Sequence, residues 1–138
     1  MMDGFYLNKR IYYHDTDAGG VVYYGSYLEH LEEARTEYLR SLGIDVAEYG
    51  RNGILFPVVH LEVDYKSPAR YADEIRVYTA IEEIGNASIH LAQEIKRGDI
   101  VLVKARTIWA CVDDKMKARR VPEDIKEKFY NSLPAAKK

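Results

Sequence analysis

The residues best suited to chemistry lie in one short segment, His14-Asp15-Thr16-Asp17-Ala18-Gly19-Gly20. Aspartate, threonine and a glycine pair after a β-prone stretch mark a loop with unusual backbone angles. Asp17 precedes a predicted long helix, whose first turn has backbone N–H groups without partners inside the helix and a positive dipole end. A thioester carbonyl placed there would be polarised, and a carboxylate a few residues earlier would act on its carbon or deprotonate a water.

Other interpretations of these residues stay open at this point. Asp17 is also suited to merely capping a turn. A metal site at His14, Asp15 and Asp17 is disfavoured, because successive side chains diverge in such a segment and no second ligand cluster stands out. The sequence has no Gly-x-Ser-x-Gly motif of a hydrolase triad. Its single cysteine, Cys111, falls in the middle of a predicted strand and is expected to be a packed thiol.

Length and composition predict one globular domain over residues 1–138. The chain is 47% hydrophobic and 30% charged, which is an ordinary balance for a folded domain. Its net charge of −2 does not suggest binding to nucleic acid. The first residues lack the blocks of a signal peptide, and no apolar run approaches the roughly 18 residues of a membrane span. With one cysteine, no intramolecular disulfide forms, which fits a cytoplasmic protein.

A helix is predicted from about Tyr27 to Leu42, and its N-terminus would supply the positive dipole end near Asp17. Apolar residues recur there at steps of three and four, so they share one face. Ser26 and Glu29 have the spacing of a capping box. Gly43 is a natural stop. A second, short surface helix is predicted in the tail, from Pro122 to Phe129.

Period-2 patterning predicts an antiparallel sheet with one buried and one wetter face. A β-prone stretch at 6–13 precedes four strands, at 57–66, 73–84, 88–97 and 100–112. The long helix must bury its single apolar stripe against one sheet face. This is the α+β hotdog fold, a curved antiparallel sheet wrapped around one long helix. The other face is predicted to be solvated or used in assembly, since it carries Glu62, Arg76, Tyr78, His90, Lys104 and Arg106.

Four stretches carry a more specific pattern, at 10–27, 33–39, 61–70 and 110–113. They resemble the 4-hydroxybenzoyl-CoA thioesterase family, and the nearest branch is the YbgC-like acyl-CoA thioesterases. The resemblance runs over roughly residues 5–125. It implies a hotdog enzyme that hydrolyses acyl-CoA to a carboxylic acid and CoA. It also implies a homo-oligomer, either a dimer or a tetramer, whose active site spans two subunits. No metal or cofactor is implied, because CoA is part of the substrate.

The resemblance also implies roles for individual residues. The family's essential carboxylate falls on Asp17, and its backbone oxyanion donor at the start of the long helix falls on Tyr24. YbgC-like members usually carry histidine at that position, whereas the hydroxybenzoyl-CoA enzyme carries tyrosine, and a backbone donor survives the exchange. Pantetheine is implied along the strand Val59-His60-Leu61. The candidates for contact with the CoA phosphates and adenine are Lys66, Arg70, Lys96 and Arg97, although each also fits an ordinary solvated charge.

Two rival functions are compatible with the same pattern. The first is another hotdog enzyme, either an acyl-carrier-protein thioesterase or a dehydratase. A dehydratase would need a histidine acting with a carboxylate, and this chain has Tyr24 where such a histidine would stand. The second is a non-catalytic acyl-binding scaffold.

Overall fold

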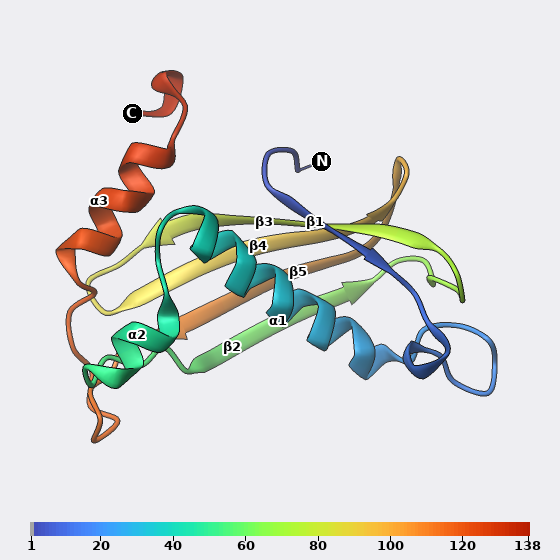
Figure 1. The fold of residues 1–138 in the computed structure, drawn as a ribbon, viewed down its shortest axis with the longest axis horizontal. Helices are drawn as coiled ribbons and strands as arrows, with labels where there is room; N and C mark the ends of the chain where they lie inside the picture. Colours follow the sequence, from blue (N-terminus) through green and yellow to red (C-terminus); the bar gives the residue numbers. More distant parts are fainter. Residues whose placement is uncertain (1) are drawn as a thin grey trace.

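The computed structural model describes residues 2–138, and its antiparallel sheet curves around one long helix (Figure 1). The five strands lie in the order β1-β3-β4-β5-β2, and every neighbouring pair is antiparallel. The predicted hotdog fold is therefore confirmed. In chain order the elements are β1 (Tyr6–Arg10), a 3-10 turn (Tyr13–Asp15), α1 (Tyr24–Ser41), α2 (Val46–Arg51), β2 (Val58–Tyr65), β3 (Glu74–Ile84), β4 (Ser88–Arg97), β5 (Ile100–Ala110), α3 (Glu123–Ser132) and a last 3-10 turn (Ala135–Lys137).

Helix α1 begins earlier than predicted and without the predicted capping box. Its first residue is Tyr24, so Ser26 lies buried inside the first turn. The residue before the helix, Tyr23, makes no side-chain cap. Its backbone N–H instead donates to the carbonyl of Asp15, at 2.8 Å. The other end agrees with the prediction, because Gly43 follows with a φ of +81°, a backbone angle that glycine adopts without strain.

Two apolar clusters fill the space between α1 and the sheet. The cluster under the first half of α1 includes Tyr27, Leu31, Ala34, Ile75, Val77 and Ile95. The cluster under the second half includes Tyr38, Leu39, Ile44, Leu91, Trp109 and Ile125. The helix therefore packs on the sheet along its whole length, as its apolar stripe predicts.

Two short helices lie near the second cluster. Helix α2 was not predicted, because six residues are too few to show a helical period. Helix α3 confirms the predicted tail helix and buries Ile125. In the part of the chain from residue 2 onward, no helix is both long and apolar enough to cross a membrane.

Strand β2 is an edge strand that a single chain leaves largely uncovered. The prediction that one of its faces is buried is wrong for this strand, because Val59, Leu61 and Tyr65 are 61%, 38% and 48% exposed. A register shift between Val58 and His60 also interrupts the alternation at Val59. Helix α1 comes closest to β1 and β3, which lie at the opposite side of the strand order from β2. Val63 packs against the first apolar cluster, but the other apolar residues of β2 lack a covering layer.

The outer face of the sheet is polar, as predicted, but it is not wholly solvated. Strand register pairs Glu62 with Arg106 across β2 and β5. Glu94 and Lys96 on β4 are buried on this face, at 5% and 6% exposure. The N-terminal segment covers them, since the backbone of Met2 donates to Glu94 at 2.6 Å and accepts from Lys96 at 2.8 Å.

Candidate active site

Asp17 lies in a tight loop, residues 16–22, whose two ends form an antiparallel bridge. The carbonyl of Asp17 accepts the N–H of Gly20 at 3.1 Å, and Gly20 has a φ of +79°, which favours glycine. One carboxylate oxygen of Asp17 accepts the N–H of Gly19 at 2.8 Å. The side chain is otherwise exposed. The loop therefore holds a carboxylate in a defined position at the surface.

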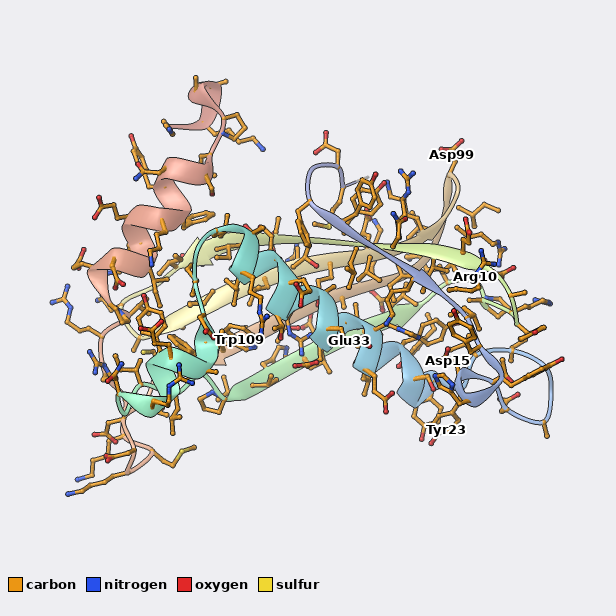
Figure 2. The ribbon with its side chains drawn as sticks, viewed as in Figure 1. Arg10, Asp15, Tyr23, Glu33, Asp99 and Trp109 are labelled. Carbon is orange, nitrogen blue, oxygen red and sulfur yellow. The ribbon has the colours of Figure 1, made fainter. Side chains whose placement is uncertain are left out.

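Asp15 joins this loop to the start of α1. Its side chain is buried, with Oδ2 accepting the N–H of Tyr12 at 2.9 Å and Oδ1 lying 3.1 Å from Nε2 of His30. Its carbonyl accepts the N–H of Tyr23 at 2.8 Å. In Figure 2, Asp15 and Tyr23 lie together at the N-terminal end of α1. The sequence interpretation missed His30, although its place beside Tyr27 on the apolar stripe marked it as a buried polar residue.

The structure does not bring His14, Asp15 and Asp17 together as ligands. Asp15 points into the protein toward His30, whereas Asp17 is exposed. Within residues 2–138, no group of three or more histidine, cysteine, aspartate or glutamate side chains is arranged to hold a metal ion.

The first turn of α1 presents backbone N–H groups toward the loop side of the molecule. Tyr24 and Gly25 are the first two helical residues, so their N–H groups have no acceptor inside the helix. The carbonyl of Tyr23 accepts the N–H of Ser26 at 2.9 Å and so orients the peptide that carries the N–H of Tyr24. A side chain at position 25 would come within 2.6 Å of the Tyr23 ring, so only glycine allows that ring to lie over the helix start.

A cavity of about 250 Å³ opens beside the start of α1. The phenol of Tyr65 donates to the carbonyl of Tyr24 at 3.3 Å, and that of Tyr27 accepts the N–H of Ala69 at 2.9 Å. Burial raises the pKa of Tyr27 and of Tyr65 above the ordinary value for tyrosine. The cavity is mostly apolar and aromatic, with one lysine, and its lining consists of Val22, Tyr24, Tyr27, Tyr65, Lys66, Ser67 and Pro68.

A larger hollow, of about 450 Å³, lies on the outer face of the sheet. Its walls are mainly charged side chains of the strands, including Glu62, Glu94 and Lys104, and neither Asp17 nor Tyr24 reaches it. The volume of a cavity therefore does not identify the active site in this structure. We place the candidate site at the smaller cavity, because its apolar walls include Tyr24 at the start of α1 and Val22 at the end of the loop that carries Asp17.

The predicted pantetheine strand is divided between the two faces of the sheet. Leu61 pairs with the buried Thr107 and so faces the helix side. His60 faces the outer side, where Nε2 lies 3.1 Å from Oε1 of Glu62. Val59 falls at the register shift and is exposed. Side chains of His60 and Leu61 consequently do not meet one ligand together.

The predicted basic residues also separate into two pairs. Lys66 lines the cavity, and Arg70 is exposed next to it in the segment that bridges Val21. Arg97 instead pairs with Asp73 at 2.9 Å. Lys96 is buried under the N-terminal segment. The last two residues are engaged within the fold.

Cys111 is fully buried, as predicted, and lies away from the candidate site in the second apolar cluster. Burial raises the pKa of its thiol, so little thiolate is present at neutral pH. These properties disfavour Cys111 as a nucleophile.

The chain is similar to known proteins in both sequence and fold. The sequence profile of the thioesterase-like superfamily matches residues 12–129. The acyl-CoA thioesterase YbgC of Haemophilus influenzae is 40% identical over 134 residues, covering 95% of this chain and 98% of that protein. The crystal structure of a probable thioesterase from Bartonella henselae is 32% identical with a TM-score of 0.79, covering 86% of this chain and 98% of that one.

A DHNA-CoA thioesterase from Staphylococcus aureus is 27% identical, with a TM-score of 0.85 over 91% of this chain and 88% of that one. The region matched by the profile contains the loop, the whole of α1 and strands β2 to β5. The chain therefore belongs to the thioesterase-like superfamily.

Proposed function

We propose that this chain hydrolyses acyl-CoA thioesters to a carboxylic acid and CoA. The observation that carries the proposal is the 2.8 Å hydrogen bond from the N–H of Tyr23 to the carbonyl of Asp15. It holds the loop with the exposed Asp17 against the helix turn that offers the N–H of Tyr24. Relatives named as acyl-CoA thioesterases, at 40% and 38% identity, support the same activity.

In the proposed reaction, the thioester carbonyl lies at the start of α1 and Tyr24 donates its N–H to the oxyanion. Asp17 acts in one of two ways. As a general base it takes a proton from a water whose oxygen bonds to the carbonyl carbon. As a nucleophile it forms an anhydride that water then opens. In both routes the carbon–sulfur bond breaks, CoA leaves as a thiolate and takes up a proton, and the acyl group leaves as a carboxylate.

The cavity beside the helix start is proposed to hold the substrate next to the reacting carbon. The ring of Tyr24 lines it and would contact the acyl group. Pantetheine is proposed to pass along the exposed side chains of Val59 and Leu61, with His60 contributing only its backbone. Lys66 and Arg70 are proposed to meet the CoA phosphates, because both are exposed at this end of the molecule.

This chemistry requires only a carboxylate, a backbone donor and water, so we propose that no metal or redox cofactor takes part. We also propose a cytoplasmic location, because the single cysteine suits a reducing compartment.

A second copy of the chain is proposed to complete the site. The uncovered apolar residues of β2 are unusual for an edge strand of a monomer, and these are Val58, Val59, Leu61 and Tyr65. Light scattering after size exclusion should give two or four times the 15.9 kDa chain mass, the latter if the polar outer faces also pair. A monomer that turns over acyl-CoA would contradict a shared site.

The function is tested by following thiol release with a dye while the chain acts on short, long and aromatic acyl-CoAs. The same acyl groups on acyl carrier protein and a β-hydroxyacyl-CoA test the rivals. We expect catalytic release of CoA. Faster cleavage of the carrier-protein substrates would indicate an acyl-carrier-protein thioesterase. Enoyl product without thiol release would indicate a dehydratase, and tight binding without either product would indicate a scaffold.

A further inference from the structure

His30 makes a buried hydrogen bond that links α1 to the segment before the loop of Asp17. The side chains of His30 and Asp15 are 6% and 3% exposed, and their Nε2 and Oδ1 atoms lie 3.1 Å apart. A carboxylate only accepts hydrogen bonds, so Nε2 is the donor. The second oxygen of Asp15 accepts the N–H of Tyr12. Because a buried carboxylate is costly without partners, the orientation of Asp15 depends on both bonds.

The backbone of Asp15 transmits this orientation to both proposed catalytic groups. Its carbonyl accepts the N–H of Tyr23, and the carbonyl of Tyr23 shares a peptide plane with the N–H of Tyr24. Asp17 follows Asp15 by two residues. We propose, on the basis of the proposed function, that His30 is a positioning residue that sets the N–H of Tyr24 relative to the carboxylate of Asp17. It acts through Asp15 and touches neither the substrate nor the reacting atoms.

The side chains around His30, among residues 2–138, offer no replacement for its hydrogen bond to Asp15. Its other ring nitrogen, Nδ1, is buried and has no hydrogen-bond partner among residues 2–138. The nearest carboxylate oxygen is Oε1 of Glu33, at 3.9 Å, and Glu33 already pairs with Lys9 at 2.7 Å. His14 lies 3.8 Å from the same oxygen of Asp15, but it is exposed, with 78% of its side chain accessible. His30 is therefore the one buried side-chain donor to Asp15 in the described chain.

A purely packing role for His30 makes a different prediction. If the ring only fills space, an apolar ring of similar size would serve, and any effect would appear in stability rather than in turnover. The bond itself is therefore the feature to remove, with the volume kept. A matched control is available at the far half of α1, where the buried phenol of Tyr38 accepts the N–H of Ile81 at 3.1 Å.

The experiment compares kcat, KM and Tm for His30→Phe, His30→Gln and Tyr38→Phe, using acyl-CoA hydrolysis. We expect His30→Phe to lower kcat about ten-fold with KM within about two-fold, because small misplacement of reacting groups is costly. His30→Gln keeps a donor at similar reach and should restore kcat to within about three-fold of wild type. Tyr38→Phe removes one buried bond from the same helix and should lower Tm while kcat stays near wild type.

The inference is overturned if folded His30→Phe keeps kcat within two-fold, or if Tyr38→Phe loses as much kcat as His30→Phe. Should His30→Phe not fold, Asp15→Asn carries the test, because it keeps the size and one acceptor but removes the charge. A comparable loss of kcat supports the inference, and an unchanged kcat refutes it. An active wild type and an inactive Asp17→Asn, together with an unaffected His30→Phe, would refute this inference alone. An inactive wild type would refute the proposed function and this inference with it.

Discussion

The two ends of helix α1 are built in different ways. The N-terminal end is held by directional hydrogen bonds, from Tyr23 to Asp15 and from His30 to Asp15. The C-terminal end is held mostly by apolar packing, in which Leu39 and Trp109 belong to one cluster with Ile125 of α3, and the phenol of Tyr38 adds one buried hydrogen bond. Figure 2 shows Asp15 and Tyr23 at the first end and Trp109 near the other.

The difference separates positioning from stability. Apolar contacts stabilise the fold but offer no hydrogen-bond donor to a ligand. The start of the helix does offer donors, because the N–H groups of Tyr24 and Gly25 have no acceptor inside the helix. Substitutions that remove the carboxylate of Asp17 or the N–H of Tyr24 should therefore change turnover more than stability. Substitutions at the second end should do the reverse.

The largest expected effect is that of Asp17→Asn. The amide keeps the size of the side chain but removes the base or nucleophile, so kcat should fall by about 10²–10⁴. Because Asp17 is exposed, circular dichroism and acyl-CoA affinity should stay close to wild type. A mutant that retains more than a few tenths of kcat would show that the assignment is wrong.

The next effect separates the backbone of Tyr24 from its side chain. Tyr24→Pro removes the N–H and should lower kcat by about 10²–10³, the range for one oxyanion donor. Tyr24→Phe keeps the N–H and the ring and should stay within a few-fold of wild type. Because proline also restricts the preceding residue, the fold of Tyr24→Pro is checked by circular dichroism first. A Tyr24→Phe enzyme as impaired as Asp17→Asn would instead indicate that the hydroxyl does acid–base chemistry.

At the opposite end of the helix, Ile125→Ala should affect stability and leave turnover intact. Ile125 is 1% exposed, so its truncation leaves a cavity that should lower the free energy of unfolding by about 2–5 kcal/mol. Urea denaturation gives that value, and kcat per folded molecule should match wild type. A matching loss of kcat would break the proposed division between the two ends.

The smallest effect is expected for Cys111→Ser. Cys111 lies in the second apolar cluster, so the hydroxyl should lower Tm modestly while thioester hydrolysis stays near the wild-type rate. The raised thiol pKa also predicts slow alkylation by iodoacetamide at pH 8 in the folded protein. Complete inactivation of a folded Cys111→Ser enzyme would revive the cysteine as a nucleophile.

Local patterns were sufficient for most of the fold. The alternation of residues located β2 to β5 to within a few positions, and the glycine at position 43 marked the end of α1. The start of α1 was misplaced because its anchor is not local: the N–H of Tyr23 is satisfied by the carbonyl of Asp15, eight residues earlier, rather than by a capping side chain.

The site was only partly accessible from the sequence. The loop of Asp17 was evident from its glycines. The burial of Asp15 and its contact with His30 instead depend on how α1 packs against the segment before that loop. Strand β2 shows a second limit, because alternation defines the two faces of a strand and does not say whether anything covers them. The exposure of its apolar residues follows only from the complete strand order, which places β2 at the edge of the sheet.

The most direct test of the account is where a substrate analogue binds. A non-hydrolysable acyl-CoA thioether is added to ¹⁵N-labelled protein, and the shift of every backbone amide signal is recorded. We expect the largest shifts at Tyr24 and Gly25, with little change from Tyr38 to Leu42 at the other end of α1. Saturable binding that leaves the Tyr24 and Gly25 signals unmoved, or moves the far end instead, would contradict a site at the helix start.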